Sequence, residues 1–495
     1  MLLRLFLLLL CGLPVPLLAA PWAPPGDARL RSALDWLADR ACLAAPITSW
    51  PVMWEDVQLA AHAPAGCASS SAWRYARFER DRAARDVTGR LTLMGANEAP
   101  DIQGFASHPR EKSALQVTLE THNRHLALGL APAFVPDPYG LDRHHLSNRW
   151  RWDGSYLAAS VGNWTLGIRA VDQWWGPGWR SSLILGSNSR PVPALFLSRR
   201  QALPADWFLL KWLGAWRFSA FAGQLEHDRV VPDAKLLGMR LVIKPASWLE
   251  LGASRTTQWG GEGRPENWNS FKDMLFGSDN YYSDFQQEPG NQLGGVDLRI
   301  GLPLGVTSTV SVYGQLIGED EAGNLPSRTV SQLGLSIAGS WLPGRQQLLL
   351  EYTDTGVDRW SGDYSPNVAY EHHIYRNGYR YFGRSLGSGW DNDSQVTSLG
   401  WWQFFTNGNA FGITIDHAEL NKDGTLSASS AWAPVPVMAL PRAENLTFYR
   451  LDWRQPLWQG RLSLSATWTS QPLVTLTSIR DRTIITASWE YRFEI

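Results

Sequence analysis

Apolar and polar residues alternate with a period of two along most of this chain from about residue 87 onward. In the segment GMRLVIK, Met239, Leu241 and Ile243 share one face. Arg240 and Lys244 share the other face. Similar alternation recurs in VDLRIGL, LELGASRT, STVSVYGQL, SQLGLSI, FGITIDH and RLSLSATW. Because successive side chains of a strand point to opposite faces, this pattern predicts many short β-strands and an all-β protein.

The expected connections between these strands alternate between two kinds. Tight turns are expected at THNRH, VGNW, KPAS, LPGRQ and TNGNA. The other connections are long, polar and aromatic: 97–113, 136–150, 259–292, 356–394 and 421–443. Short turns at one end and long loops at the other are typical of a bacterial outer-membrane barrel, with the turns in the periplasm and the loops outside. A soluble β-sandwich has no reason to sort its loops in this way.

Counting the hairpins gives about 18 strands, an even number that leaves both termini on the periplasmic side. The sixth strand is either ALFLSRR or DWFLLKW, both within residues 183–215. The last strand, IITASWEYRF, alternates apolar and polar residues and ends on an aromatic residue, Phe493. It resembles the strand by which the barrel assembly machinery recognises such proteins, although Glu494 and Ile495 follow.

The residues before the alternating region have different patterns. The first 20 residues, MLLRLFLLLLCGLPVPLLAA, combine an early arginine with an apolar stretch and small residues, which predicts a secretory signal peptide. No later apolar run is as long as the ~18 residues of a membrane-spanning helix. Residues 21–86 contain three amphipathic segments with helical spacing: DARLRSALDWLADRACL, TSWPVMWEDVQLAA and SSSAWRYARFERDRAARDV. We therefore predict a small α-helical domain at 21–86 and a membrane barrel at 87–495.

Composition supports the membrane barrel and excludes one class of partner. The chain has 27 tryptophans against 17 phenylalanines, and tryptophan favours half-apolar, half-wet surroundings such as a membrane interface. A net charge of −1 gives no concentrated positive field, so we expect no nucleic-acid partner. After signal-peptide removal two cysteines, Cys42 and Cys67, would remain in an exported chain. A disulfide and two buried thiols are both open possibilities.

Two aromatic stretches are candidate carbohydrate-binding sites. DQWWGPGW places Trp174, Trp175 and Trp179 around a Gly-Pro-Gly turn, and the strand count puts it at the extracellular end. RNGYRYFGR concentrates arginines and tyrosines in a predicted loop. Aromatic faces stack on sugar rings, and guanidinium groups bind carboxylate or hydroxyl oxygens. The candidate residues are Trp174, Trp175, Trp179, Arg180, Tyr379, Arg380 and Arg384.

Each candidate has an alternative structural role. The tryptophans could form the aromatic girdle at the membrane interface. The arginines could face inward and pair with acidic residues to fill the lumen. A corner of a compact core is the least favoured role for DQWWGPGW, because a membrane barrel has no compact core to turn.

Signals for catalysis or metal binding are weak. GRSLG around Ser385 matches a nucleophile elbow, but its flanks are an aromatic loop and not a strand and a helix. The adjacent pairs His144-His145 and His372-His373 would point apart on a strand. The acidic stretches around Asp320 and Asp391 lack the spacing of a known calcium loop. We expect no catalytic residue, no metal and no cofactor.

Four long stretches carry a resemblance to a known family. They are RLRSALDWLADR with ITSWPVMWEDV, WWGPGWRSSLILGSNSRPVPALFLSR, EPGNQLGGVDLR, and YEHHIYRNGYRYFGRSLGSGWDNDSQVTSLG. Through essentially the whole mature chain, the sequence resembles the Wzi-type capsule assembly proteins of the outer membrane. This resemblance implies an 18-stranded barrel whose base is plugged by a periplasmic helical domain, here 21–86. It also implies a lectin that holds capsular polysaccharide at the cell surface.

The function expected from the sequence is therefore a non-enzymatic outer-membrane lectin that anchors or organises a capsular or extracellular polysaccharide. The expected partners are this polymer, outer-membrane lipid and the barrel assembly machinery, with the protein acting as a monomer. Two alternatives are a polysaccharide or solute channel, because an 18-stranded barrel has a wide lumen, and a surface enzyme that modifies the polymer through Ser385.

Overall fold

A computed structural model of the chain describes residues 21–85, 87–106, 109–123, 125–138, 149–276, 290–322, 325–359 and 362–494. The predicted signal peptide at 1–20 lies outside these residues, as does the pair His144-His145. No helix within the described ranges has the length and apolar character needed to cross a membrane.

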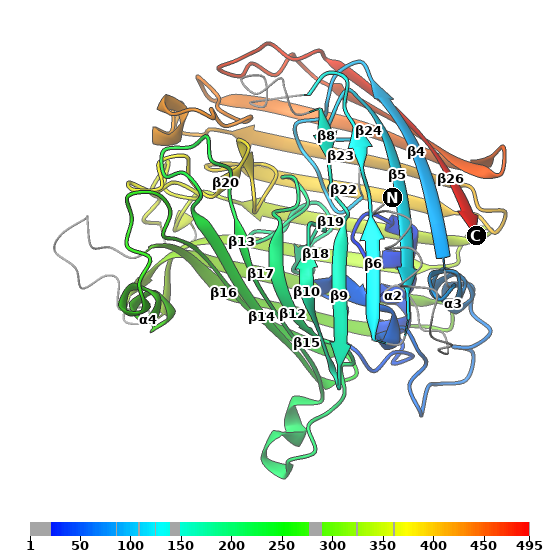
Figure 1. Ribbon diagram of the computed structural model, residues 1–495. Coiled ribbons are helices and arrows are strands. Elements are labelled where there is room, and N and C mark those ends of the chain that lie inside the picture. Colours follow the sequence, from blue (N-terminus) through cyan, green and yellow to red (C-terminus); the bar gives the residue numbers. More distant parts are fainter. Residues whose placement is uncertain are drawn as a thin grey trace, which may run out of the picture.

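The alternating region forms one closed antiparallel barrel of 18 strands (Figure 1). Two of these strands are interrupted, since β6 continues into β7 and β8 into β9, and the first barrel strand, β4, pairs with the last, β26. The segments are β4 Val87–Ala96, β5 Ser113–His122, β6 Leu126–Leu130, β7 Ala133–Phe134, β8 Trp150–Arg151, β9 Tyr156–Val161, β10 Trp164–Arg169, β12 Ala194–Arg199, β13 Ala215–Gln224, β14 Lys235–Ala246, β15 Leu249–Trp259, β16 Gly290–Leu304, β17 Ser308–Ala322, β18 Leu325–Gly339, β19 Arg345–Asp354, β22 Gln395–Phe404, β23 Ala410–Leu420, β24 Glu444–Leu457, β25 Gly460–Thr469 and β26 Thr483–Glu494.

The period-two pattern separates the outer wall of the barrel from its lumen. On β14, Leu241 is 39% exposed on the outer wall, whereas its neighbour Arg240 faces the lumen and is 1% exposed. Strand β16 repeats this arrangement, with Val296 and Leu298 exposed outside and Asp297 and Arg299 buried inside. Since a membrane barrel has lipid outside and a polar interior, this distribution confirms the predicted fold class.

The structure identifies the sixth strand. ALFLSRR forms β12, which pairs with β10 on one side and β13 on the other. DWFLLKW lies in the connection that follows and forms a 3₁₀-helix, η3 Phe208–Leu213, with no buried residue.

Connections differ between the two ends of the barrel. At the short-turn end, β9–β10, β14–β15, β16–β17 and β24–β25 are joined by only a few residues. At the opposite, long-loop end lie the described residues of the other connections, 97–106, 109–112, 170–193, 225–234, 260–276, 355–359, 362–394 and 421–443, which include helix α4 Trp268–Phe276. Figure 1 shows α4 and β20 at one end of the barrel and the C-terminus at the other.

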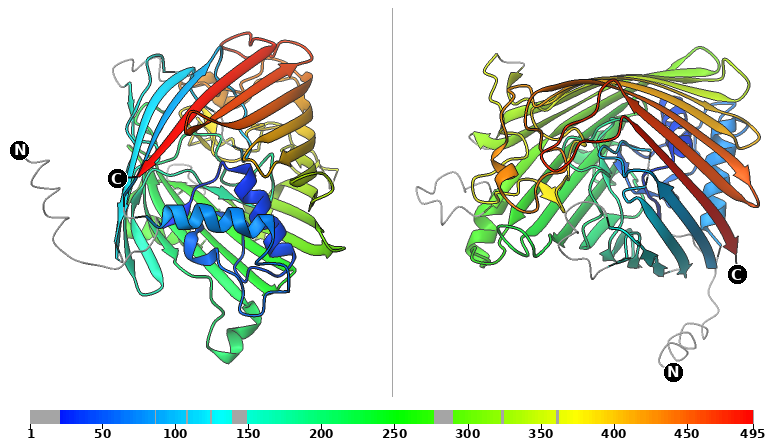
Figure 2. Two further views of the ribbon diagram at one scale, coloured as in Figure 1. Left: turned by 90° about the vertical axis from the view of Figure 1, so that its right-hand side faces the viewer. Right: turned by 90° about the horizontal axis from the view of Figure 1, so that it is seen from above.

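The residues before the barrel fold into its short-turn end. They form β1 Trp22–Ala23, α2 Ala28–Asp39, β2 Ser49–Trp50, β3 Val52–Met53, η1 Trp54–Asp56 and α3 Ser71–Ala83. The side chains of Asp27 and Ser70 cap the two α-helices by accepting hydrogen bonds from backbone N–H groups of the first turn. Helix α2 is almost completely buried and contacts β16, β17 and β18. Figure 2 (left) shows both helices across this mouth of the barrel; we refer to residues 21–85 as the plug.

Of the three helices predicted in the plug, the second does not form, so that prediction is wrong. TSWPVMWEDVQLAA forms the two-residue strands β2 and β3 and the short η1 turn in place of an α-helix. Pro51 disfavours the helical conformation of the residue before it. In addition, β2 pairs with β11 in the lumen and β3 with β1, so the backbone hydrogen bonds of this segment are made to other segments.

The plug contains a disulfide, one of the two possibilities that the sequence allowed for its cysteines. Cys42 and Cys67 are bonded, with their Cα atoms 5.8 Å apart and a separation of 25 positions along the chain. Both cysteines are buried in the apolar cluster that α2 and α3 share with Trp50 and Trp174. The bond therefore links the end of α2 to the segment that leads into α3.

Candidate functional site

The connection between β10 and β12, residues 170–193, folds back into the barrel, and we call it the lumen segment. Its two-residue strand β11, Trp174–Trp175, pairs with β2 of the plug. The backbone N–H of Gly176 also donates to the carbonyl oxygen of Thr48 at 3.0 Å. The side chains of Trp174 and Trp175 are each 1% exposed. The lumen segment is thus continuous with the plug through backbone hydrogen bonds.

The prediction that DQWWGPGW lies at the outer rim is therefore wrong. Trp174, Trp175 and Trp179 are buried inside the barrel, which removes their rings from both sugar and lipid. The Gly-Pro-Gly turn makes this packing possible, because a Cβ on Gly178 would lie 2.3 Å from the carbonyl oxygen of Ser181. The core corner, least favoured from the sequence, describes this segment best, since the plug supplies a compact core that the strand pattern did not show.

A cationic side chain of the plug joins this aromatic cluster. The guanidinium of Arg31 lies 4.3 Å from the ring centroid of Phe105 and 4.5 Å from that of Trp179. Phe105 in turn packs edge-on against Trp50 and Trp174. The cluster brings together a helix of the plug, the lumen segment and the connection between β4 and β5.

Arg180, another predicted sugar ligand, is also engaged within the lumen. Its Nε and Nη2 donate to the two carboxylate oxygens of Asp416 on β23, at 3.0 and 2.6 Å. The backbone N–H groups of Trp179, Arg180 and Ser181 donate to the carboxylate of Glu351 on β19, at 2.7, 3.0 and 2.9 Å. Two acidic residues of the barrel wall thus hold the lumen segment.

The connection between β19 and β22 forms a second packed layer at the long-loop end. We call its residues 362–394 the tyrosine loop. The hydroxyl of Tyr370 donates to the carbonyl oxygen of Leu183 at 2.7 Å, and that of Tyr379 donates to Ile184 at 2.9 Å. Both tyrosine rings are fully buried. The tyrosine loop therefore rests directly on the lumen segment.

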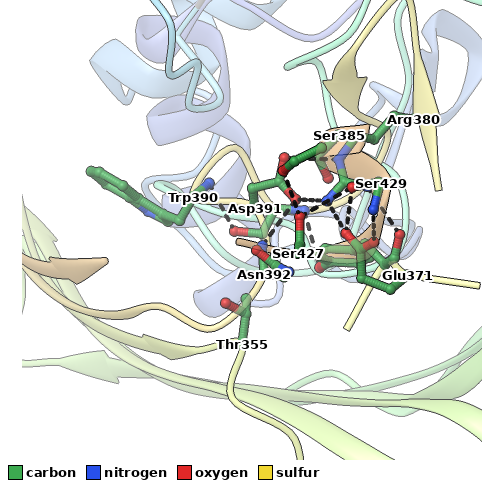
Figure 3. A network of polar contacts seen from close by, with 12 residues as sticks. Thr355, Glu371, Arg380, Ser385, Trp390, Asp391, Asn392, Ser427 and Ser429 are labelled. Atoms are coloured by element: carbon green, nitrogen blue, oxygen red, sulfur yellow. Dashed lines mark hydrogen bonds and ion pairs between the residues drawn. The ribbon is translucent and has the colours of Figure 1, made fainter. Parts of the chain in front are cut away.

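The two arginines of this loop that were predicted to bind sugar make their contacts within the protein. Arg380 is 2% exposed and pairs with Asp391 at 2.5 Å and with Glu371 at 2.7 Å (Figure 3). Burial by itself would lower the pKa of Arg380, but these two carboxylates raise it. Arg384 donates to the backbone carbonyl oxygens of Asp101 and Pro100, each at 2.9 Å.

The residues predicted to bind sugar thus lie inside the barrel, where they pack against one another or form hydrogen bonds and ion pairs. Tyr379, Arg380 and Arg384 are each buried, as are Arg180 and the three tryptophans. The alternative that the arginines fill the lumen by pairing with acids describes Arg180 and Arg380. The sequence could not separate the two roles, because both use the same residue types.

The geometry around Ser385 differs from a nucleophile elbow. Ser385 ends the hairpin of β20 Arg380–Tyr381 and β21 Arg384–Ser385. It is 1% exposed and does not lie between a strand and a helix. A reacting polymer would have no access to its hydroxyl.

In the described part of the chain, one group of side chains has the spacing of metal ligands. The ligand atoms of His227, Asp233 and Glu262 lie within 4.8 Å of one another at the long-loop end. Nδ1 of His227 lies 3.0 Å from a carboxylate oxygen of Asp233, and this contact raises the pKa of the imidazole. Because exposed acidic groups are common without an ion, we assign no metal here.

Sequence reasoning missed an exposed pair at the long-loop end. Arg376 belongs to the same RNGYRYFGR motif as Arg380, yet its side chain is exposed. Its guanidinium lies 4.8 Å from the ring centroid of Trp432, which is 36% exposed in the connection between β23 and β24. Nothing in the sequence distinguishes Trp432 from the other loop tryptophans.

Comparisons with known proteins agree with this architecture. The model of the family described as capsule assembly protein Wzi matches residues 82–483. An uncharacterized 55.8 kDa protein in the cps region of Klebsiella pneumoniae is 34% identical over 331 residues, which are 66% of this chain and 64% of that protein. This chain therefore matches slightly less than two thirds of that relative's length.

A solved structure extends the similarity to nearly the whole chain. It is Wzi of Escherichia coli, described as an outer membrane protein involved in group 1 capsule assembly and as a carbohydrate-binding β-barrel. The TM-score is 0.80 at 26% sequence identity, covering 96% of this chain and 100% of the other. Because the family model spans most of its length, the chain belongs to the Wzi family of capsule assembly proteins.

Proposed function

We propose that this outer-membrane protein is a lectin that holds capsular or extracellular polysaccharide at the cell surface. One observation carries the proposal: the chain shares its fold over 96% of its length with a barrel described as carbohydrate binding. The plug, the lumen segment and the tyrosine loop occupy the barrel, so polymer would bind at the surface of the long-loop end. That end would face outside the cell and the plug would face the periplasm.

The remaining partners follow from the same arrangement. The exposed leucines of the outer wall would contact outer-membrane lipid. The strand β26, with Trp489, Tyr491 and Phe493 on one face, would be recognised by the barrel assembly machinery. A monomer suffices for each of these roles.

Gene deletion with complementation tests the anchoring role. Cells that lack the protein should release polymer into the medium without making less of it, and the wild-type gene should restore cell-bound polymer. The measurement is the ratio of cell-bound to released polymer at equal total amount. An unchanged ratio after deletion would refute anchoring.

The two alternative functions make different predictions. A channel requires steady large currents across a planar bilayer, whereas the filled lumen predicts small currents from the purified protein. A polymer-modifying enzyme requires that the length or acylation of the polymer change on incubation and that Ser385→Ala abolish the change. We propose a non-enzymatic role, and the burial of Ser385 supports it.

A further inference from the structure

We propose that Arg376 and Trp432 form a binding site for a carboxylate-bearing sugar residue of the polymer. This inference rests on the proposed lectin function and names the chemistry that its binding surface recognises. The two residues come from neighbouring long connections: Arg376 from the tyrosine loop and Trp432 from the connection between β23 and β24.

Arg376 is an available positive charge. Of the residues that the structure describes, none places a carboxylate oxygen within 4.0 Å of its guanidinium. Its contacts are a hydrogen bond from Nε to the carbonyl oxygen of His373, at 3.2 Å, and the cation–π contact with Trp432. Arg380, four positions later, has two carboxylate partners and is buried. Of these two arginines in one motif, Arg376 is the one that an external anion can reach.

The two connections are fixed to one another beneath this pair. The side-chain amide of Asn377 donates to the carbonyl oxygen of Ala433 at 2.9 Å, which joins the residues that follow Arg376 and Trp432. The side-chain oxygen of Asn377 accepts from the backbone N–H of Val230 at 2.7 Å, so a third connection is held as well. Because the side chain of Asn377 bridges all three, the positions of the guanidinium and the indole ring are set before polymer arrives.

A buried ion-pair network continues this support. Glu371, which pairs with Arg380, also accepts from the backbone N–H and the hydroxyl of Ser429, at 2.9 and 2.8 Å. Figure 3 shows Glu371 close to both Arg380 and Ser429. Ser429 lies in η6, Ala428–Ala431, which directly precedes Trp432. Rigid support of this kind reduces the entropy lost when a flexible polymer binds.

The chemistry of the pair suits an acidic sugar. A cation–π contact uses the face of the guanidinium, and its N–H groups can still donate to a carboxylate. The exposed part of the indole ring offers an apolar surface to the C–H groups of a pyranose. A single site of this size binds weakly, but a repeating polymer engages many copies of the protein at once.

Binding of two forms of the same polymer to the purified protein tests the site. The probes are the extracellular polysaccharide purified from the producing strain and the same material after chemical reduction of its carboxyl groups. Wild-type protein should bind the native polymer at least tenfold more tightly than the reduced one, which corresponds to about 1.4 kcal/mol, because hydrogen bonds to a charged group are stronger than those to a neutral hydroxyl. Arg376→Gln should remove this preference, and Trp432→Ala should weaken binding of both forms.

Arg442→Gln is the matched control. Arg442 is an exposed arginine of the same connection as Trp432, but it is paired with Glu444 at 2.9 Å. This variant should bind like wild type, and all variants should show the same heat-modifiable migration as folded barrels. Equal binding of native and reduced polymer by wild type, or unchanged binding by Arg376→Gln and Trp432→Ala, would overturn the site and leave the lectin function standing. If wild-type protein binds neither form, the proposed function itself fails.

Discussion

Arg180 donates two hydrogen bonds to the carboxylate of Asp416 inside the barrel, at 3.0 and 2.6 Å, and both side chains are buried. This pair attaches the lumen segment to β23 of the barrel wall. Together with the three backbone N–H groups bound by Glu351, it holds WWGPGW inside the barrel.

Replacing Asp416 by asparagine should loosen the lumen segment. The substitution keeps the volume of the side chain but removes the charged partner that is hydrogen-bonded to the buried guanidinium of Arg180. Loss of one partner of a buried ion pair costs about 3–5 kcal/mol. We expect larger and noisier currents across a planar bilayer than for wild type. Glu419 lies on the same strand as Asp416 and forms a partly exposed pair with Lys422, so Glu419→Gln should leave the currents unchanged. Wild-type currents from Asp416→Asn would show that this pair does not hold the segment.

Trp174→Ala should destabilise the protein without acting on polymer binding directly. The ring is 1% exposed and its Nε1 donates to the carbonyl oxygen of Gly178 at 2.9 Å. Removing a buried ring of this size costs about 3–5 kcal/mol, so the temperature of the heat-modifiable transition should fall. Trp458→Ala is the control, because Trp458 is 80% exposed at the β24–β25 turn. If Trp174→Ala left the transition temperature unchanged and abolished polymer binding, the result would contradict the packing role and support stacking of Trp174 on sugar.

Reduction of the Cys42–Cys67 disulfide should weaken the plug. The bond closes a loop whose ends are 25 residues apart, and closing a loop of this size in the unfolded chain stabilises the folded state by about 3 kcal/mol. Reductant should therefore increase proteolysis of residues 21–85 before the barrel unfolds. The double variant Cys42→Ser with Cys67→Ser should show the increased proteolysis without reductant and should not respond to it.

Acid should weaken the attachment of α2 to the barrel through Asp27. Burial alone would raise the pKa of this carboxyl, but the charges of Arg461 and Arg454 lower it. With hydrogen bonds from Tyr75 and the backbone N–H of Leu30, the pKa of Asp27 reaches about 2. Its stabilisation is complete above the unfolded-state pKa of about 4 and is lost as the pH falls toward 2.

Thermal unfolding at pH 5 and at successively lower pH measures this contribution. Asp27→Asn retains a capping side chain but removes the charge, so its stability should depend less on pH than that of wild type. Asp81→Asn should change the profile little, because the Asp81 pairs are exposed and screened by solvent. Parallel wild-type and Asp27→Asn profiles would contradict the assigned role.

The amino-acid sequence by itself determined the barrel. Alternation such as that of Arg240 and Leu241 depends only on the two-residue period of a strand, and the sorting of short turns and long loops depends only on where those strands end. These local properties were enough to predict the fold class and the number of strands. The two amphipathic helices of the plug, with their caps at Asp27 and Ser70, follow from equally local signals.

Tertiary structure decided where the segments that lack a regular apolar–polar alternation lie. The aromatic residues of WWGPGW are compatible with an outer rim, a girdle or a core, and the choice depends on β2 of the plug, more than 100 residues away in the sequence. Likewise, Arg376 and Arg380 have similar neighbours along the chain. Their roles differ because Arg380 forms ion pairs with Asp391 and Glu371, whereas Arg376 contacts the ring of Trp432. A pattern of side chains shows which charges exist, but only long-range packing shows which of them are already neutralised.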